Sequence, residues 1–333
     1  MTSVLLICLG VTWLLMGCHR DGGDSPAVEV VVYVSVDEPV AAPILKRFER
    51  ETGIRVRVVT DAEASKTTGL VEKLLAERAS PRADVYWGNE IFRSINLADE
   101  GVLAAYRPTS ADSVPARWRD ADDLFTCVGL RARVLVRATG AQGPAQLNGL
   151  ASLIDPSLKG KIAISHPGFG TASGHFAALY VAWGEEKYRA YVHGLRANKV
   201  KLLGGNSAVV AQVAAGNILA GLTDNDDVSN ALTEGQAVEQ VIPDQGAGDA
   251  GVLLIPGTVC LIKGAPHPDQ AKRLIDFLCE RSVEEELISA KFAAYSVRGD
   301  APVRTMDVDY REVGGHLRRA VEIALSILQD RAE

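Results

Sequence analysis

Residues 28–59, VEVVVYVSVDEPVAAPILKRFERETGIRVRVV, contain the pattern that decides the fold. The run Val28–Val36 is rich in β-branched residues, as expected of a buried strand. Pro39 then opens a segment whose apolar residues recur on one helical face, and Gly53 ends it. A second strand is predicted over residues 54–58, where apolar residues alternate with arginines. This strand–helix–strand order predicts a parallel sheet covered by helices.

The same alternation continues along the chain and predicts two α/β lobes. Further strands are expected at Ala83–Trp87, Cys127–Arg137, Lys161–Ser165, Lys199–Leu203 and Ile218–Thr223. Helices are expected around Leu70–Leu75, up to Gly101, and at Ser173–Trp183, Ala208–Ala215, Pro268–Glu280, Glu284–Lys291 and Tyr310–Gln329. The β-rich stretch Gly251–Ile262 is expected to return the chain to the first lobe, as in a hinged binding protein.

The N-terminus has the features of an export signal. Val4–Met16 is almost wholly apolar, too short to span about 30 Å of hydrocarbon but suited to the core of a signal peptide. The following Gly17-Cys18 completes a segment that resembles a lipobox. We therefore predict a signal peptide at 1–17, lipidation of Cys18, and a polar tether at 18–27. The alternative is a buried N-terminal helix with an incidental cysteine.

Composition limits the possible partners and compartments. The mature part of about 315 residues is long enough for two domains. The chain carries 35 Lys and Arg against 42 Asp and Glu, which argues against nucleic acid as a partner. Cys127, Cys260 and Cys279 allow at most one disulfide, and no cysteine or histidine spacing suggests zinc. We expect a periplasmic or cell-surface protein that touches the membrane only through its N-terminal lipid.

Common catalytic signatures are absent from the sequence. There is no GxxxxGK[ST] loop and no HExxH motif, and the serine of GTASG at 170–174 stands one place too late for GxSxG. Ser173 and His175 are the one nominal nucleophile and base, but residues i and i+2 of a helix point apart. The sequence therefore favours a protein that is not an enzyme. An enzyme or a signalling receptor on the same fold is the alternative.

The segment 221–228, GLTDNDDV, places three carboxylates and an amide directly after an apolar strand. Ligands of open α/β sheets collect beyond the carboxyl ends of the strands. Crowded carboxylates raise one another's pKa unless a cation offsets them, and oxygen ligands suit hard cations such as Fe³⁺, Ca²⁺ or Mg²⁺. The alternative is that Asp224 or Asp226 simply caps the next helix.

Other polar groups at predicted strand ends are expected to face the same cleft. Small residues open a helix at 168–175, where free backbone amides and the hydroxyls of Thr171 and Ser173 suit an anion; an ordinary loop and helix cap is the alternative. Asn206 lies at a similar turn. The first lobe contributes Asp37, Asn89 and Glu90.

Several segments resemble the ferric-iron-binding periplasmic proteins, notably 33–37, 48–54, 83–87 and 263–268. The resemblance implies a type II periplasmic-binding-protein fold, with two lobes of mostly parallel sheet covered by helices and a ligand cleft between them. It also implies an ABC uptake transporter, whose permease and ATPase receive the solute from a monomeric binding protein without a tightly bound cofactor. The lobes are expected to comprise residues 28–125 with 254–297, and 126–253 with 298–333.

The resemblance also implies roles for individual residues. The tyrosine pair of the iron binders falls on Asp226 and Asp227, their histidine ligand on Asp37, and their glutamate on Asn89 or Glu90. The residues that hold their accessory anion correspond to Ser173, Gly174, Asn206 and Asp224. We add Thr171 to the expected anion site, on the loop chemistry given above. The expected solute is ferric iron or another hard cation. Because both tyrosines are replaced, the alternative is an organic amine, phosphonate or sugar phosphate.

Overall fold

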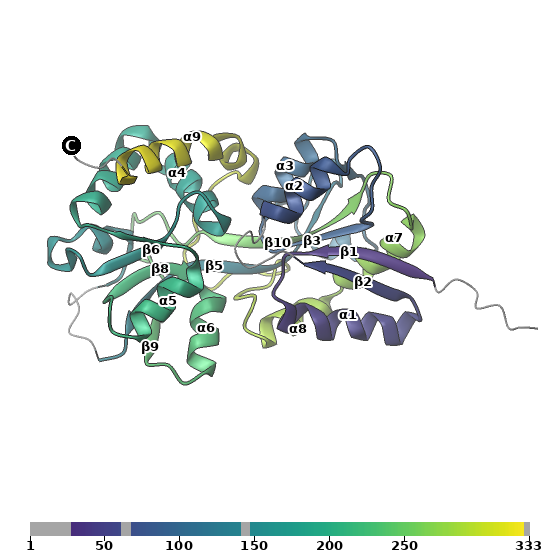
Figure 1. The fold of residues 1–333 in the computed structure, drawn as a ribbon, viewed down its shortest axis with the longest axis horizontal. Helices are drawn as coiled ribbons and strands as arrows, with labels where there is room; N and C mark the ends of the chain where they lie inside the picture. Colours follow the sequence, from purple (N-terminus) through teal and green to yellow (C-terminus); the bar gives the residue numbers. More distant parts are fainter. Residues whose placement is uncertain (1–27, 61–67, 141–146, 330–333) are drawn as a thin grey trace, which may run out of the picture.

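The computed structural model describes residues 28–60, 68–140 and 147–329. The predicted signal peptide, the tether and Cys18 lie outside these residues. The described chain forms two lobes side by side, joined through the middle of one sheet (Figure 1). No described helix is long and apolar enough to cross a bilayer.

The first lobe contains the strand–helix–strand unit that the sequence predicts. Its elements are β1 (Glu29–Val34), α1 (Glu38–Thr52), β2 (Arg55–Thr60), α2 (Thr68–Ala76), β3 (Val85–Gly88), α3 (Ile91–Asp99), β4 (Leu103–Ala104), β10 (Leu254–Ile262), α7 (Pro268–Leu278) and α8 (Arg281–Ser289). Strands β2, β1 and β3 are parallel. Gly53 ends α1 in the left-handed conformation, with φ of 70° and its amide bonded to the Glu49 carbonyl, a geometry that glycine adopts readily.

The second lobe repeats the pattern. Its elements are β6 (Ile162–Ser165), α4 (Gly170–Ala197), β7 (Lys201–Leu203), α5 (Asn206–Ala214), β8 (Ala220–Asp224), α6 (Asn225–Thr233), β9 (Val238–Val241) and α9 (Tyr310–Gln329). Strands β7, β6 and β8 are parallel. The sequence predicts a helix that ends at Trp183; the structure interrupts α4 at Gly184, with φ of 74°, and continues it to Ala197.

Strand β5 (Thr126–Ala138) joins the lobes. Its first half pairs with β10, and its second half pairs with β8 and β9, all antiparallel. The sheet therefore runs β2-β1-β3-β10-β5-β8-β6-β7. The chain crosses between the lobes in β5, again between β9 and β10, and a third time between α8 and α9. The predicted crossing and return are confirmed, whereas the residue boundaries of the lobes remain a prediction.

A buried carboxylate fixes the start of the third crossing. Glu284 of α8 is 1% exposed and accepts hydrogen bonds from the amides of Gly129 in β5 (3.3 Å) and Val297 (2.6 Å). It also pairs with the guanidinium of Arg298 at 2.6 Å, and both side chains are buried. One side chain thus ties α8, β5 and the third crossing together.

Replacing Glu284 by alanine is expected to lower the free energy of unfolding by about 3–5 kcal/mol, because Arg298 is left as a buried, unpaired charge. Urea denaturation monitored by circular dichroism measures this loss. The matched control is Glu285→Ala, an exposed neighbour on the same helix, for which we expect a change within about 0.5 kcal/mol. Equal effects of the two substitutions would contradict this account of Glu284.

Candidate solute site between the lobes

Three aspartates gather where β8 ends and α6 begins. Carboxylate oxygens of Asp224, Asp226 and Asp227 lie within 4.8 Å of one another. Asp224 and Asp226 are buried, and Asp227 is half-buried. The sequence alone predicts this grouping, because the three residues lie within four positions directly after an apolar strand, at one end of the sheet.

Two arginines of β5, which the sequence analysis did not single out, face these aspartates. Arg133 is fully buried, and its Nη1 donates to Asp224 Oδ1 at 2.6 Å. Arg131 Nη1 donates to Asp224 Oδ2 at 3.2 Å and to Asp226 Oδ2 at 3.0 Å. The sequence feature that indicates them is a pair of charged residues, two positions apart, in an otherwise apolar strand. Side chains two positions apart in a strand lie on the same face, so both arginines point to the same side of the sheet.

Asp224 is the centre of a hydrogen-bond network and not a helix cap. It occupies the position before α6, but its side chain makes no capping hydrogen bond. Its Oδ2 instead accepts from Thr171 Oγ1 at 2.7 Å and from Asn206 Nδ2 at 2.9 Å. Arg133 Nη1 also donates to Thr171 Oγ1 and Asn206 Oδ1. The capping alternative is therefore wrong for Asp224, whose charge is balanced by the arginines.

Asp226 and Asp227 are the two carboxyl groups of the cluster whose charge is least favourable in the ion-free protein. Asp226 Oδ1 is buried and has no hydrogen-bond partner among the described residues. Burial raises the pKa of Asp226 to about 6, with Arg131 opposing the rise and Asp224 and Asp37 adding to it. Burial and the neighbouring carboxylates also raise the pKa of Asp227 well above its ordinary value. Since Asp37 belongs to the first lobe, carboxyl groups of both lobes influence the pKa of Asp226.

Glu90 and Asn89, the other two residues predicted from the first lobe, make different contacts. Both oxygens of Glu90 cap α3, accepting from the amides of Phe92 (2.7 Å) and Arg93 (3.2 Å). Glu90 is 1% exposed, and burial raises its pKa. Asn89 is also buried, and its backbone carbonyl accepts from Arg131 Nη2 at 2.8 Å. Asn89 therefore joins the network through its backbone, whereas the Glu90 carboxylate is engaged in its own helix.

The residues predicted to bind an anion make two different kinds of contact. Thr171 and Asn206 belong to the Asp224 network, as described above. Ser173 Oγ donates to the Gly170 carbonyl at 2.7 Å. Gly174 lies against Phe92 of α3 so closely that a Cβ there would be 2.0 Å from the ring. The amino ends of α3 and α4 thus meet across the two lobes, and Gly174 is required by this contact.

The nominal pair Ser173 and His175 is not arranged as nucleophile and base. While Ser173 bonds to Gly170, the buried His175 accepts from Arg133 Nε through Nδ1 at 3.5 Å. Burial and the adjacent guanidinium lower the pKa of His175 well below its ordinary value. The imidazole is therefore a neutral packing partner of Arg133.

Residues 28–288 match the family described as bacterial extracellular solute-binding protein. The chain belongs to this family. Its members bind solutes outside the cytoplasm, and membership confirms the resemblance found in the sequence. Iron uptake protein A1 of Synechocystis is 26% identical over 301 residues, which are 85% of this chain and 80% of that protein. A putative 2-aminoethylphosphonate-binding periplasmic protein of Salmonella typhimurium is 27% identical over 240 residues, covering 71% and 68% of the two chains.

Solved structures confirm the fold of this solute-binding protein. The apo ferric ion-binding protein A of Pasteurella haemolytica superposes with a TM-score of 0.81 at 22% identity. The match covers 92% of this chain and all of that one. The two-lobed type II periplasmic-binding-protein architecture is therefore shared over essentially the whole described chain.

Proposed function

We propose that this protein captures a hard cation, ferric iron first among candidates, for an ABC importer and holds it with an accessory anion. One observation carries the proposal: Asp226 Oδ1 is buried, lacks a hydrogen-bond donor within the described structure, and lies in a cluster of three carboxylates. A buried carboxylate oxygen is costly unless a donor or cation satisfies it. A cation held there would interact with Asp227 and, from the other lobe, with Asp37.

The charges of the site support a cation. The three clustered aspartates lie close to the guanidinium of Arg131, and Arg133 pairs with Asp224, while Asp37 acts on Asp226 from the first lobe. Four carboxyl groups against two guanidiniums give the site a formal excess of negative charge, and a bound cation would favour the ionised forms of Asp226 and Asp227 because Coulomb interactions are strong in a buried place. All candidate ligand atoms are oxygens, as hard cations prefer. The carboxylates would replace the phenolates that the resemblance leads one to expect at Asp226 and Asp227.

Arg133 offers a buried hydrogen-bond donor for the accessory anion. Arg133 Nη2 is buried and has no hydrogen-bond partner among the described residues. It belongs to the same guanidinium that bonds Thr171 and Asn206. Guanidinium groups bind carboxylate and phosphate oxygens strongly. We therefore place the anion beside Arg133, next to two of the residues that the sequence analysis assigned to it.

The same arrangement supports a second candidate, a zwitterionic organic solute. Its amine would pair with Asp226 and Asp227, and its phosphonate or phosphate with Arg133. The unpartnered Nη2 of Arg133 favours this candidate, as does the relative named for 2-aminoethylphosphonate.

The proposed function also includes the oligomeric state, the location and the transport partners of the protein. We propose a monomer, with lobes at the boundaries given above, anchored outside the cytoplasm through a lipid on Cys18 and working with a permease and its ATPase. We propose no catalytic activity, which the engaged side chains of Ser173 and His175 support. Adjacent permease and ATPase genes would support the transport role, and their absence would count against it.

A thermal-shift screen of the purified mature chain separates the two solutes. A specific ligand at a hundredfold excess over its Kd is expected to stabilise the protein by about 2.7 kcal/mol. We expect ferric citrate to give such a shift, with citrate alone as the control. A shift with 2-aminoethylphosphonate and none with ferric citrate would favour the zwitterion and overturn the cation.

A further inference from the structure

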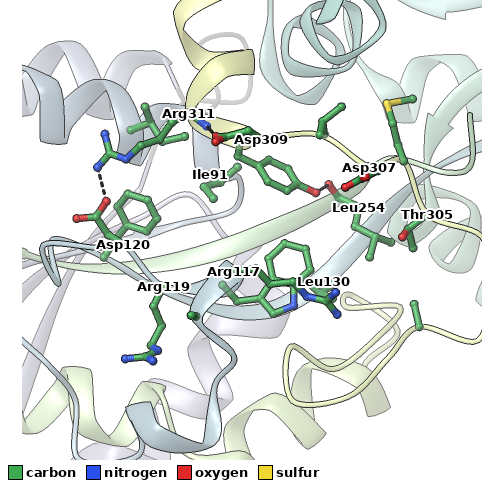
Figure 2. Close-up of a pocket in the computed structure, with 18 of the residues that line it drawn as sticks. Ile91, Arg117, Arg119, Asp120, Leu130, Leu254, Thr305, Asp307, Asp309 and Arg311 are labelled. Carbon is green, nitrogen blue, oxygen red and sulfur yellow. Dashed lines mark hydrogen bonds and ion pairs between the residues drawn. The ribbon is translucent and has the colours of Figure 1, made fainter. Parts of the chain in front are cut away.

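A cavity of about 730 Å³ lies beside the segments that join the lobes (Figure 2). Leu130 of β5 and Leu254 of β10 line it, together with parts of residues 299–311 in the third crossing. Successive side chains of a strand point to opposite faces, so Leu130 faces the cavity while Arg131 faces the aspartates. The cavity is therefore separate from the proposed cation site, on the other side of β5.

One residue of the cavity wall carries an unsatisfied hydrogen-bond donor. Trp118 lines it and is 5% exposed, yet its indole Nε1 is buried and has no hydrogen-bond partner in the part of the chain that the structure describes. The ring lies 5.7 Å from that of Tyr310, whose hydroxyl is already bonded to the Leu254 carbonyl at 2.7 Å. An acceptor inside the cavity would remove the cost of burying a free N–H.

The rest of the lining combines apolar side chains with charged residues of both signs. Ile91, Ile95 and Phe125 contribute apolar surface. Among the charged residues of the lining, Arg311 pairs with Asp120, as Figure 2 shows, and Arg117 pairs with Asp300 at 3.3 Å. In all, three arginines and four aspartates line the cavity, so neither sign of charge dominates. This lining suits an uncharged molecule better than the ions expected at the cation site.

We propose that this cavity is a second binding site, for an uncharged organic molecule with a ring-sized apolar body and a carbonyl oxygen. The carbonyl accepts from Trp118 Nε1, and the body packs against Leu130, Leu254 and the Tyr310 ring. The volume falls within the range of about 300–1,000 Å³ that is usual for small-molecule sites.

The test uses the fluorophore Prodan, an uncharged naphthalene bearing a ketone. Titration into the whole mature chain is expected to give saturable binding with a blue-shifted emission. By NMR, the indole N–H resonance that is missing in Trp118→Phe is expected to move downfield in the wild-type protein as Prodan binds. Trp118→Phe keeps a ring but removes the donor, and should weaken binding about tenfold, the effect of one hydrogen bond.

Two further variants complete the design. Trp183→Phe, whose indole packs on Tyr191 in α4, is the matched control and should bind Prodan like wild type. Ala301→Trp, which adds a large ring to the lining, should abolish binding; circular dichroism checks that each variant is folded. The proposal is overturned if Prodan shows no saturable binding to the wild-type protein, or if a folded Trp118→Phe or Ala301→Trp variant binds it with unchanged affinity.

Discussion

Replacing Asp226 and Asp227 together by asparagine is expected to reduce the affinity for ferric iron at least a thousandfold. The change removes two charges from the buried carboxylate cluster while keeping the shape of both side chains. A thousandfold loss corresponds to about 4 kcal/mol of binding free energy. Titration calorimetry with ferric citrate measures it directly.

The unfolding of the same variant shows whether the loss is specific. Burial raises the pKa of both carboxyls, so their charged forms are unfavourable in the ion-free protein, and the double variant should be at least as stable as wild type. Asp269→Asn is the matched control, because Asp269 is also an acid in the first turn of a helix, but an exposed one. The assignment of the site is wrong if the double variant binds iron as wild type does.

Asp224→Ala is expected to cost about 3–5 kcal/mol of unfolding free energy. The substitution leaves Arg133 fully buried without its carboxylate and removes one of the two carboxylates that Arg131 contacts. Urea denaturation measures the loss. Glu239→Ala is the control on β9, which also pairs with β5: Glu239 pairs with Arg137 at 2.9 Å, but both side chains are substantially exposed, and such pairs contribute about 0–1 kcal/mol.

A compensating substitution tests the physical reason given for the loss of stability in Asp224→Ala. If the cost arises from the unpaired guanidinium, Arg133→Met in the Asp224→Ala background should restore part of the stability, because an apolar side chain replaces a buried charge. A double variant that is no more stable than Asp224→Ala would contradict the charge-balance account of Asp224.

Much of the fold was predictable because its signals are local. The β-branched run of β1, the proline that opens α1 and the glycine that ends it are neighbours in the sequence. The lengths of β5 and β10 likewise follow from their apolar runs. Hydrophobic periodicity alone does not predict where the chain crosses between the lobes. The prediction of these crossings relied on the family resemblance.

The site was predictable only in part, because its contacts join distant segments. The three aspartates lie within four consecutive residues, so the sequence predicts their grouping. Arg133 meets Asp224 across 91 positions, and the two arginines of its strand do not reveal in the sequence which groups they contact. Glu90 was predicted to face the cleft, but its position before α3 lets it cap the helix instead. Gly174 was assigned to an anion, and its contact with Phe92 depends on how the lobes meet.

The central claim is that carboxylates of both lobes bind a hard cation. Equilibrium dialysis of the purified mature chain against ferric citrate, with bound iron measured by atomic absorption, tests it most directly. We predict one iron per chain at saturation and essentially none in the Asp226→Asn, Asp227→Asn double variant. Iron-free wild-type protein after dialysis, together with saturable binding of 2-aminoethylphosphonate, would contradict the claim.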